Sequence, residues 1–367
     1  MANDKTTASR FSFAALDPRL EQIIYLPTEE KAHGRDWVTW GTNNAYPFYL
    51  EGLCHSVPTL RSIILGLVDY VCGDEVEVLR GLRDGDRFDR RGTTGRQIVR
   101  ATAESIAKKG GFAWKITRNV NGTPGEIEVL DPADIRTDED NEVFYYSEEW
   151  EKRGSSAKTI MYPKWMPEAT DIAESILWVK VWGGGAYPEP LYAASIKACE
   201  TERSIDEFHL GNIERGFMGS YIVNFNGGTM PTDREKEEVE RTFTEKFGGK
   251  KNAGRIMFSW NRNKDSQTTL TKMEVADYGE KYETLAKHCR QQIFTAFRAN
   301  PNLFGVNTEN NGFTDEDFDK SFKLFNRTMV QPIQRAILDG FEAVMGVRGT
   351  IRIHPFTLEG ATENTEA

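Results

Sequence analysis

The four cysteines and five histidines are the most versatile side chains of this sequence, but their spacing favours no metal site. Cys54, Cys72, Cys199 and Cys289 contain no CxxC pair, so structural zinc is not indicated and the thiols are expected to be reduced. Cys199 and Cys289 lie within helical apolar patterns, which predicts that both pack in a core. The histidines form no HxxxH or HExxH pattern and are interpreted as surface or packing residues.

The glycine-rich segments do not fit a nucleotide-binding loop. Gly183-Gly184-Gly185 is not followed by Lys-Ser/Thr and does not match GxGxxG, the patterns whose backbone amides cradle phosphate. No nucleophile elbow and no pair of catalytic carboxylates stands out. The sequence therefore predicts no catalytic residue, no metal, no cofactor and no enzyme.

One cluster of acids keeps an enzymatic alternative open. Asp131, Asp134, Asp138 and Asp140 could hold a metal ion in a nucleic-acid enzyme. Their spacing is not that of a calcium loop, and their position after a predicted hairpin favours a solvated turn.

Length, hydropathy and charge narrow the function further. The 367 residues suggest two or three domains, and the longest apolar stretch, 62–68, is far shorter than the roughly 18 residues of a membrane span. The N-terminus carries no signal segment, so a soluble protein made in the cytoplasm is expected. The net charge of −10 disfavours tight wrapping of nucleic acid, but an acidic wall would let DNA slide past.

The first half of the sequence predicts an α+β domain. Apolar residues recur at helical spacing over 58–71 and 94–110. Residues 112–118 alternate like a strand, Asn121-Gly122 supplies a hairpin turn, and 125–130 return. Further strands are predicted at 143–146 and 176–182.

The second half predicts long helices around a small mixed segment. A helix is expected over 191–215, and residues 188–215 contain six acids and three bases. The segment that follows predicts strands at 221–225, 255–260 and 269–275 and a helix that begins at Thr232.

Two further helices are predicted from apolar stripes over 277–299 and 315–345. Pro332 lies inside the second stripe and should kink that helix, because proline has no backbone donor. The polar stretch 300–313 between them is too long for an ordinary connection, which makes it a candidate functional loop.

In this order the segments resemble the portal proteins of tailed bacteriophages, in the HK97-type branch. The run Ile293–Gly305 is similar to the family's "I-x-x-x-F-x-x-P-x-x-L-x-G", although Arg298-Ala299-Asn300-Pro301 departs from the usual small residue and proline. The weaker matches are Gly41–Pro47, Gly111–Pro132 and Tyr187–Pro190.

The resemblance implies a portal-like α+β fold with a mixed wing, two long stem helices around an α/β clip, and a kinked helix. Only about twenty residues remain for a crown, so a reduced crown is expected. The implied parts are wing 1–187, first stem helix 188–215, clip 216–275, second stem helix 276–300, tunnel loop 301–314, kinked wing helix 315–345 and short crown 346–367.

The resemblance also implies a function without catalysis. The chain would form a ring, usually of twelve subunits, at the portal vertex of a virion assembled in a bacterial host's cytoplasm. The ring would pass double-stranded DNA without sequence specificity and would contact the terminase large subunit, a head-completion or adaptor protein, and the major capsid and scaffold proteins. No membrane partner is expected.

The DNA-facing candidates are the tunnel-loop residues Asn307, Thr308, Glu309, Asn310 and Asn311 and the stem-wall residues Glu200, Asp206, Glu207 and Glu214. The alternatives are another virion structural protein, such as an adaptor or minor capsid component, and the metal-dependent enzyme.

Overall fold

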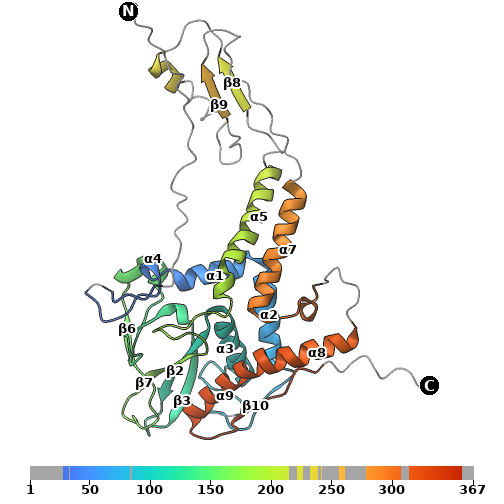
Figure 1. The fold of residues 1–367 in the computed structure, drawn as a ribbon. Coiled ribbons are helices and arrows are strands. Elements are labelled where there is room, and N and C mark those ends of the chain that lie inside the picture. Colours follow the sequence, from blue (N-terminus) through green and yellow to red (C-terminus); the bar gives the residue numbers. More distant parts are fainter. Residues whose placement is uncertain are drawn as a thin grey trace, which may run out of the picture. The chain divides into compact units, whose positions relative to one another are not determined.

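The protein is described from a computed structural model, in which the chain divides into two compact units (Figure 1). The larger unit contains Ile24–Glu202 and Ala286–Ala367, and the smaller unit contains Arg203–Leu285. The structure describes residues 28–32, 34–82, 85–214, 221–225, 232–238, 241, 256–260, 278–306 and 314–357.

Three helices form the N-terminal helical part of the larger unit: α1 (Tyr46–Ser56), α2 (Pro58–Cys72) and α3 (Gly95–Lys109). Helix α3 begins with a capping box at Thr94 and ends at Gly110, whose φ of 87° is left-handed. Helix α2 packs against α3 and is apolar on one face. The most deeply buried side chains of that face are Leu60, Ile63, Ile64, Leu67 and Val71.

Two antiparallel sheets pack beside these helices. The first has the order β3-β2-β7, with β2 at Gly111–Arg118, β3 at Pro124–Leu130 and β7 at Glu174–Lys180. The register places Trp114 of β2 opposite Val129 and Leu177. The predicted hairpin at Asn121-Gly122 is confirmed as the connection between β2 and β3.

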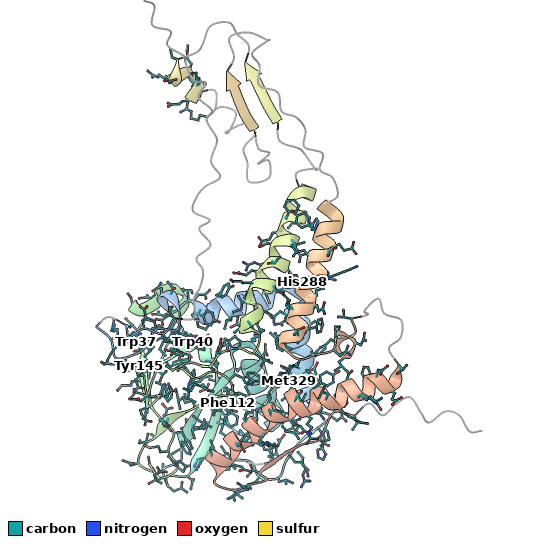
Figure 2. All side chains as sticks on the ribbon, in the orientation of Figure 1. Trp37, Trp40, Phe112, Tyr145, His288 and Met329 are labelled. Atoms are coloured by element: carbon teal, nitrogen blue, oxygen red, sulfur yellow. The ribbon has the colours of Figure 1, made fainter. Side chains whose placement is uncertain are left out.

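The second sheet has the order β4-β5-β6, with strands Ile135–Thr137, Val143–Tyr146 and Ile160–Pro163. A short helix, α4 (Trp150–Arg153), follows β5. An aromatic cluster lies at this sheet and consists of Trp37, Tyr145 and Trp150. The ring centroid of Trp37 lies 5.2 Å from that of Tyr145 and 5.3 Å from that of Trp150. Figure 2 labels Trp37 and Tyr145.

A buried arginine holds Asn44 of the segment Gly41–Pro47. Arg136 is fully buried between Trp40 and Trp150, and its Nε donates to Asn44 Oδ1 at 2.9 Å. Asn44 adopts a φ of 62°, which asparagine tolerates, and its carbonyl accepts a second bond from Arg136. Burial lowers the pKa of Arg136 to about 10, which still leaves it charged at neutral pH.

The C-terminal part of the larger unit is one long helical run. Helix α8 (Asp315–Phe325) continues through a π-helical segment, Asn326–Val330, into α9 (Gln331–Met345). Helix α9 packs on α3 and β7 (Figure 1). Gly340 of α9 lies against the Phe112 and Trp114 rings of β2, because a Cβ there would lie 3.1 Å from Phe112 and 3.2 Å from Trp114.

One strand pair ties the end of this run to the N-terminal helices. Strand β1 (Val76–Val78) pairs antiparallel with β10 (Ile351–Ile353). The short described segment after β10 is thereby fixed near α2, where the carboxylate of Asp74 accepts hydrogen bonds from Thr357.

Two long helices, α5 (Ile196–Glu214) and α7 (Tyr278–Ala296), run from one unit into the other. Strands β8 (Tyr221–Phe225) and β9 (Ile256–Trp260) of the smaller unit pair in parallel, which requires a crossover connection. Residues 233–238 between them are helical, as the capping pattern at Thr232 predicts. The strand predicted at 269–275 lies outside the described residues.

The helix predicted from Leu191 begins later, at Ile196. The residues before it form a 3-10 turn, Ala193–Ser195, after Pro190. Tyr192 is fully buried and donates a hydrogen bond to the Lys108 carbonyl at 2.9 Å. This packing with α3 outweighs the helical tendency of the local sequence.

Two lysines at the end of α3 are buried with their counter-charges. Lys108 and Lys109 each place Nζ 2.9 Å from a carboxylate oxygen of Glu51, and Lys109 Nζ lies 2.6 Å from Asp131 Oδ1. Burial alone would raise the pKa of Glu51, but the ammonium groups of Lys109 and Lys108 outweigh it and lower that pKa to about 2. The network joins α1, α3 and the end of β3.

We predict that Glu51→Gln lowers the free energy of unfolding at pH 7 by on the order of 3 kcal/mol, because the charge that holds both lysines is lost. The pKa of Glu51 is lower in the folded than in the unfolded state, so its stabilisation is complete above about pH 4.5 and disappears as the pH falls toward 2. Urea unfolding of both proteins between pH 3 and 7 measures this. Glu142→Gln, at an exposed ion pair with Lys164, is the control and should change stability by under about 0.5 kcal/mol. A Glu51→Gln effect of equal size at pH 3 and pH 7 would contradict the prediction.

Candidate functional site

The acids at the start of α5 attach this helix to the larger unit. Glu200 Oε1 accepts a hydrogen bond from the Tyr49 hydroxyl at 2.6 Å. Glu202 is only 5% exposed, accepts from the Thr59 hydroxyl at 2.7 Å and lies 4.0 Å from Arg290 Nε. Glu200, predicted as a stem-wall residue, is therefore engaged by α1 of its own chain.

The acids further along α5 are exposed. Glu207 is 70% exposed and lies 3.6 Å from Arg203, and Asp206 is also exposed. Both belong to the smaller unit, where Phe208 of α5 packs against Tyr282 of α7 with ring centroids 4.9 Å apart. Glu214 is the last residue of α5. A stem wall made by Asp206, Glu207 and Glu214 stays a prediction.

The chain after α7 is ordered where a polar loop was expected. Residues Pro301–Phe304 form a 3-10 helix, which is capped by Asn300 at its start and by Gly305, with a left-handed φ of 71°, at its end. Leu303 is buried, and its carbonyl accepts a hydrogen bond from the Tyr70 hydroxyl at 2.7 Å. The expectation of an irregular loop from residue 301 is wrong for these four residues, because α2 supplies partners that the local sequence does not reveal.

Phe304 lies in a cluster of rings that we name the aromatic junction. Its centroid lies 5.9 Å from Phe294, 6.0 Å from Tyr70 and 5.7 Å from Phe325. The junction joins α2, α7, the 3-10 helix, α8 and the segment after β10. Its members are Tyr70, Phe294, Phe304, Phe322, Phe325 and Phe356.

The start of α8 is fixed as well. Thr314 and Asp317 form a reciprocal capping box, and their hydrogen bonds lower the pKa of Asp317. Asn300 Nδ2 donates to Ser321 Oγ at 3.2 Å, which links the end of α7 to α8. The connection 307–313 is therefore anchored at both ends in the larger unit. The predicted tunnel-loop residues Asn307, Thr308, Glu309, Asn310 and Asn311 fall within it, outside the described residues.

Pro332 lies in the first turn of α9, directly after the π-helical segment. Its ring would crowd the carbonyl four residues earlier in a regular α-helix, and the wider π turn relieves this contact. The predicted bend at Pro332 stays a prediction.

An open hollow of about 470 Å³ lies beside Pro332 and is lined by Arg327, Gln331, Pro332 and Arg335. This hollow was not predicted from the sequence. The only sequence signal for it is the four-residue spacing of Arg327, Gln331 and Arg335, which places them on one helix face.

The alternative metal cluster is not formed by the described residues, among which no three His, Cys, Asp or Glu side chains are placed to hold a metal ion. Asp131 pairs with Lys109, and Asp138 Oδ1 accepts backbone hydrogen bonds from Glu142 and Val143. Burial and the charge of Asp131 raise the pKa of Asp134 to about 6. Asp131 thus shapes the turn after β3, and Asp138 shapes the turn between β4 and β5. The four cysteines are free and buried, as predicted for Cys199 and Cys289.

Comparison with known proteins identifies the fold. Neither a protein-family profile nor a curated protein sequence matches the chain. A chain in the virion of a native gene transfer agent particle is similar with a TM-score of 0.56 and 15% identity, over 88% of this chain and 86% of that one. A chain in the neck of a native particle of this kind, computed with C12 symmetry, is similar with a TM-score of 0.53 and 14% identity, over 85% of each chain. An HK97 family phage portal protein from Corynebacterium diphtheriae is similar with a TM-score of 0.48 and 10% identity, over 82% of this chain and 92% of that one.

The chain therefore shares its fold with chains found in the virion and neck structures of gene transfer agent particles. The α+β fold class expected from the sequence is confirmed, whereas its portal-like division into wing, stem, clip and crown stays a prediction. Among the described residues, no helix is long and apolar enough to cross a membrane.

We predict that Gly66→Ala in α2 lowers the free energy of unfolding by about 2 kcal/mol, because the new Cβ would lie 2.7 Å from the Phe304 ring. Gly52→Ala in α1 is the matched control, since a Cβ there meets nothing within 4 Å and alanine favours the helix. Urea unfolding of the two variants and the parent protein measures the difference. Equal stability of the two variants would show that Phe304 does not rest on α2 as described.

Proposed function

We propose that this chain is a portal protein, the subunit of a ring at one capsid vertex through which double-stranded DNA is packaged and released. The observation that carries the proposal is the fold shared with virion and neck proteins over 88% and 85% of the chain. The C12 symmetry of that neck supports twelve subunits here as well. Such a ring is held by heterologous contacts that close by rotation.

The anchored connection 307–313 supports the channel role. Its two ends are held by the 3-10 helix at Pro301–Phe304 and by the capping box at Thr314. A short polar connection held in this way suits weak, sequence-independent contact with the DNA backbone. The exposed acids Asp206 and Glu207 would contribute a wall that does not retain phosphate.

The proposed partners follow from the same role. The terminase large subunit would dock on the clip, residues 216–275, during packaging, and a head-completion or adaptor protein would replace it. The clip sequence has ten bases and eight acids, a slight local excess of positive charge in an acidic chain. Major capsid and scaffold proteins would surround the ring in the host cytoplasm, and the protein would perform no catalysis.

Ring formation is the direct test of this proposal. We expect the purified chain to scatter light with a mass of about twelve times 41.6 kDa and to show rings with a central hole in negative-stain micrographs. A uniform monomer or dimer that persists with capsid and scaffold protein present would contradict it and would favour an adaptor or minor capsid component.

The channel role predicts a separable defect. Deletion of Asn307–Asn311 should leave ring mass unchanged and should reduce the DNA packaged or retained by particles, because the anchors outside the deletion remain. Replacement of the same five residues by a Gly-Ser segment of equal length distinguishes loss of the side chains from shortening of the connection. Normal DNA content in particles with the deletion would remove these residues from the channel.

A further inference from the structure

A line of three exposed cations crosses the helical run α8–α9. Lys323, Arg327 and Arg335 are exposed, and Gln331 occupies the four-residue step between the two arginines. Because side chains four residues apart share a helix face, these groups form one stripe along about 18 Å of helix. Arg327, Gln331 and Arg335 line the hollow of about 470 Å³ beside Pro332.

None of the three cations has an ion pair with a described residue, which distinguishes them from their neighbours. Lys320 pairs with Glu316 at 2.6 Å on the same helix, and Arg348 pairs with Glu342 at 3.3 Å just beyond it. Asp319 lies one helical turn before Lys323, and Asp339 lies one turn after Arg335. Among the described residues, neither acid forms an ion pair with Lys323, Arg327 or Arg335.

The opposite face of the helix is rigidly packed. Met329, Val330 and Ile333 are at most 3% exposed, and Figure 2 labels Met329. The π-helical segment Asn326–Val330 contacts α2 and precedes Pro332, and π-helical turns within α-helices are frequent at functional sites. The core therefore fixes the backbone that presents Arg327, Gln331 and Arg335 to solvent.

We propose that this basic hollow binds the phosphate backbone of duplex DNA. A guanidinium offers a planar fork of donors that matches phosphate oxygens, and Gln331 adds a neutral donor between the two forks. Arg327 and Arg335 lie about 12 Å apart along the helix, a span over which a DNA strand with one phosphate per roughly 3.4 Å presents several charges. In a chain of net charge −10, this stripe is a local reversal of sign that favours a regular polyanion. The choice of DNA as the polyanion rests on the proposed function.

The test uses the full chain and a fluorescein-labelled duplex of about 30 base pairs, whose binding is followed by anisotropy at several salt concentrations. The double variant Arg327→Gln/Arg335→Gln should lose about tenfold in affinity at low salt, and the slope of log K against log salt should fall by about 1.8. Arg80→Gln/Arg87→Gln is the matched control, because both arginines are exposed and have no ion pair among the described residues. It should bind DNA like the parent chain, and all three proteins should unfold at the same temperature.

Equal losses in both double variants would overturn the inference, because they would reflect general charge. Unchanged DNA binding by Arg327→Gln/Arg335→Gln would also overturn the inference. A lower ring mass in that variant would overturn it as well, because the hollow would then contact a second copy of the chain. The ring assay keeps the two proposals distinct. Rings without DNA binding at the hollow would reject only this inference, and DNA binding at the hollow by a protein that forms no rings would reject the proposed function and support the inference.

Discussion

The aromatic junction is the constraint on which the candidate site depends. Tyr70 lies between 5.1 and 6.0 Å from the ring centroids of Phe304, Phe322, Phe325 and Phe356, so one side chain of α2 holds three later segments of the chain. Its hydroxyl also bonds the Leu303 carbonyl. Aromatic contacts of this kind contribute about 0.5–1.5 kcal/mol per pair beyond the area that they bury. Gly66 completes the junction, because only its missing side chain leaves room for the Phe304 ring.

Both proposed DNA contacts follow from this junction. It fixes the start of the connection 307–313 and the course of α8, and the buried side of the π-helical segment extends that anchoring to Arg327 and Arg335. Under the two proposals, opposite charges would have different roles. The exposed acids Asp206 and Glu207 on α5 would form a wall past which DNA moves. Arg327 of the π-helical segment and Arg335 of α9, which form no ion pair with a described residue, would hold phosphate.

Local sequence patterns predicted most helices and strands, because periodicity and caps act within a few residues. Asn121-Gly122 specifies its hairpin, and the stripe over 277–299 specifies α7. The 3-10 helix at Pro301–Phe304 could not be predicted in this way, since its partners in α2 are more than 200 residues away in sequence. The same holds for Lys108 and Lys109, which look like an exposed helix end but are buried against Glu51. Of the candidate site, the sequence proposed the connection 307–313 and the acids of α5, whose roles stay predictions. It missed the basic hollow, because the residues of one helix face do not reveal what packs behind them.

A cryo-electron microscopy reconstruction of the purified oligomer would show whether the connection 307–313 faces a channel at the centre of a ring. We expect a closed ring whose narrowest point is formed by residues 307–313 from every subunit, with α8 running outward from it. A ring whose narrowest point is formed by other residues, with 307–313 on its outer surface, would rule out the proposed channel role of this connection.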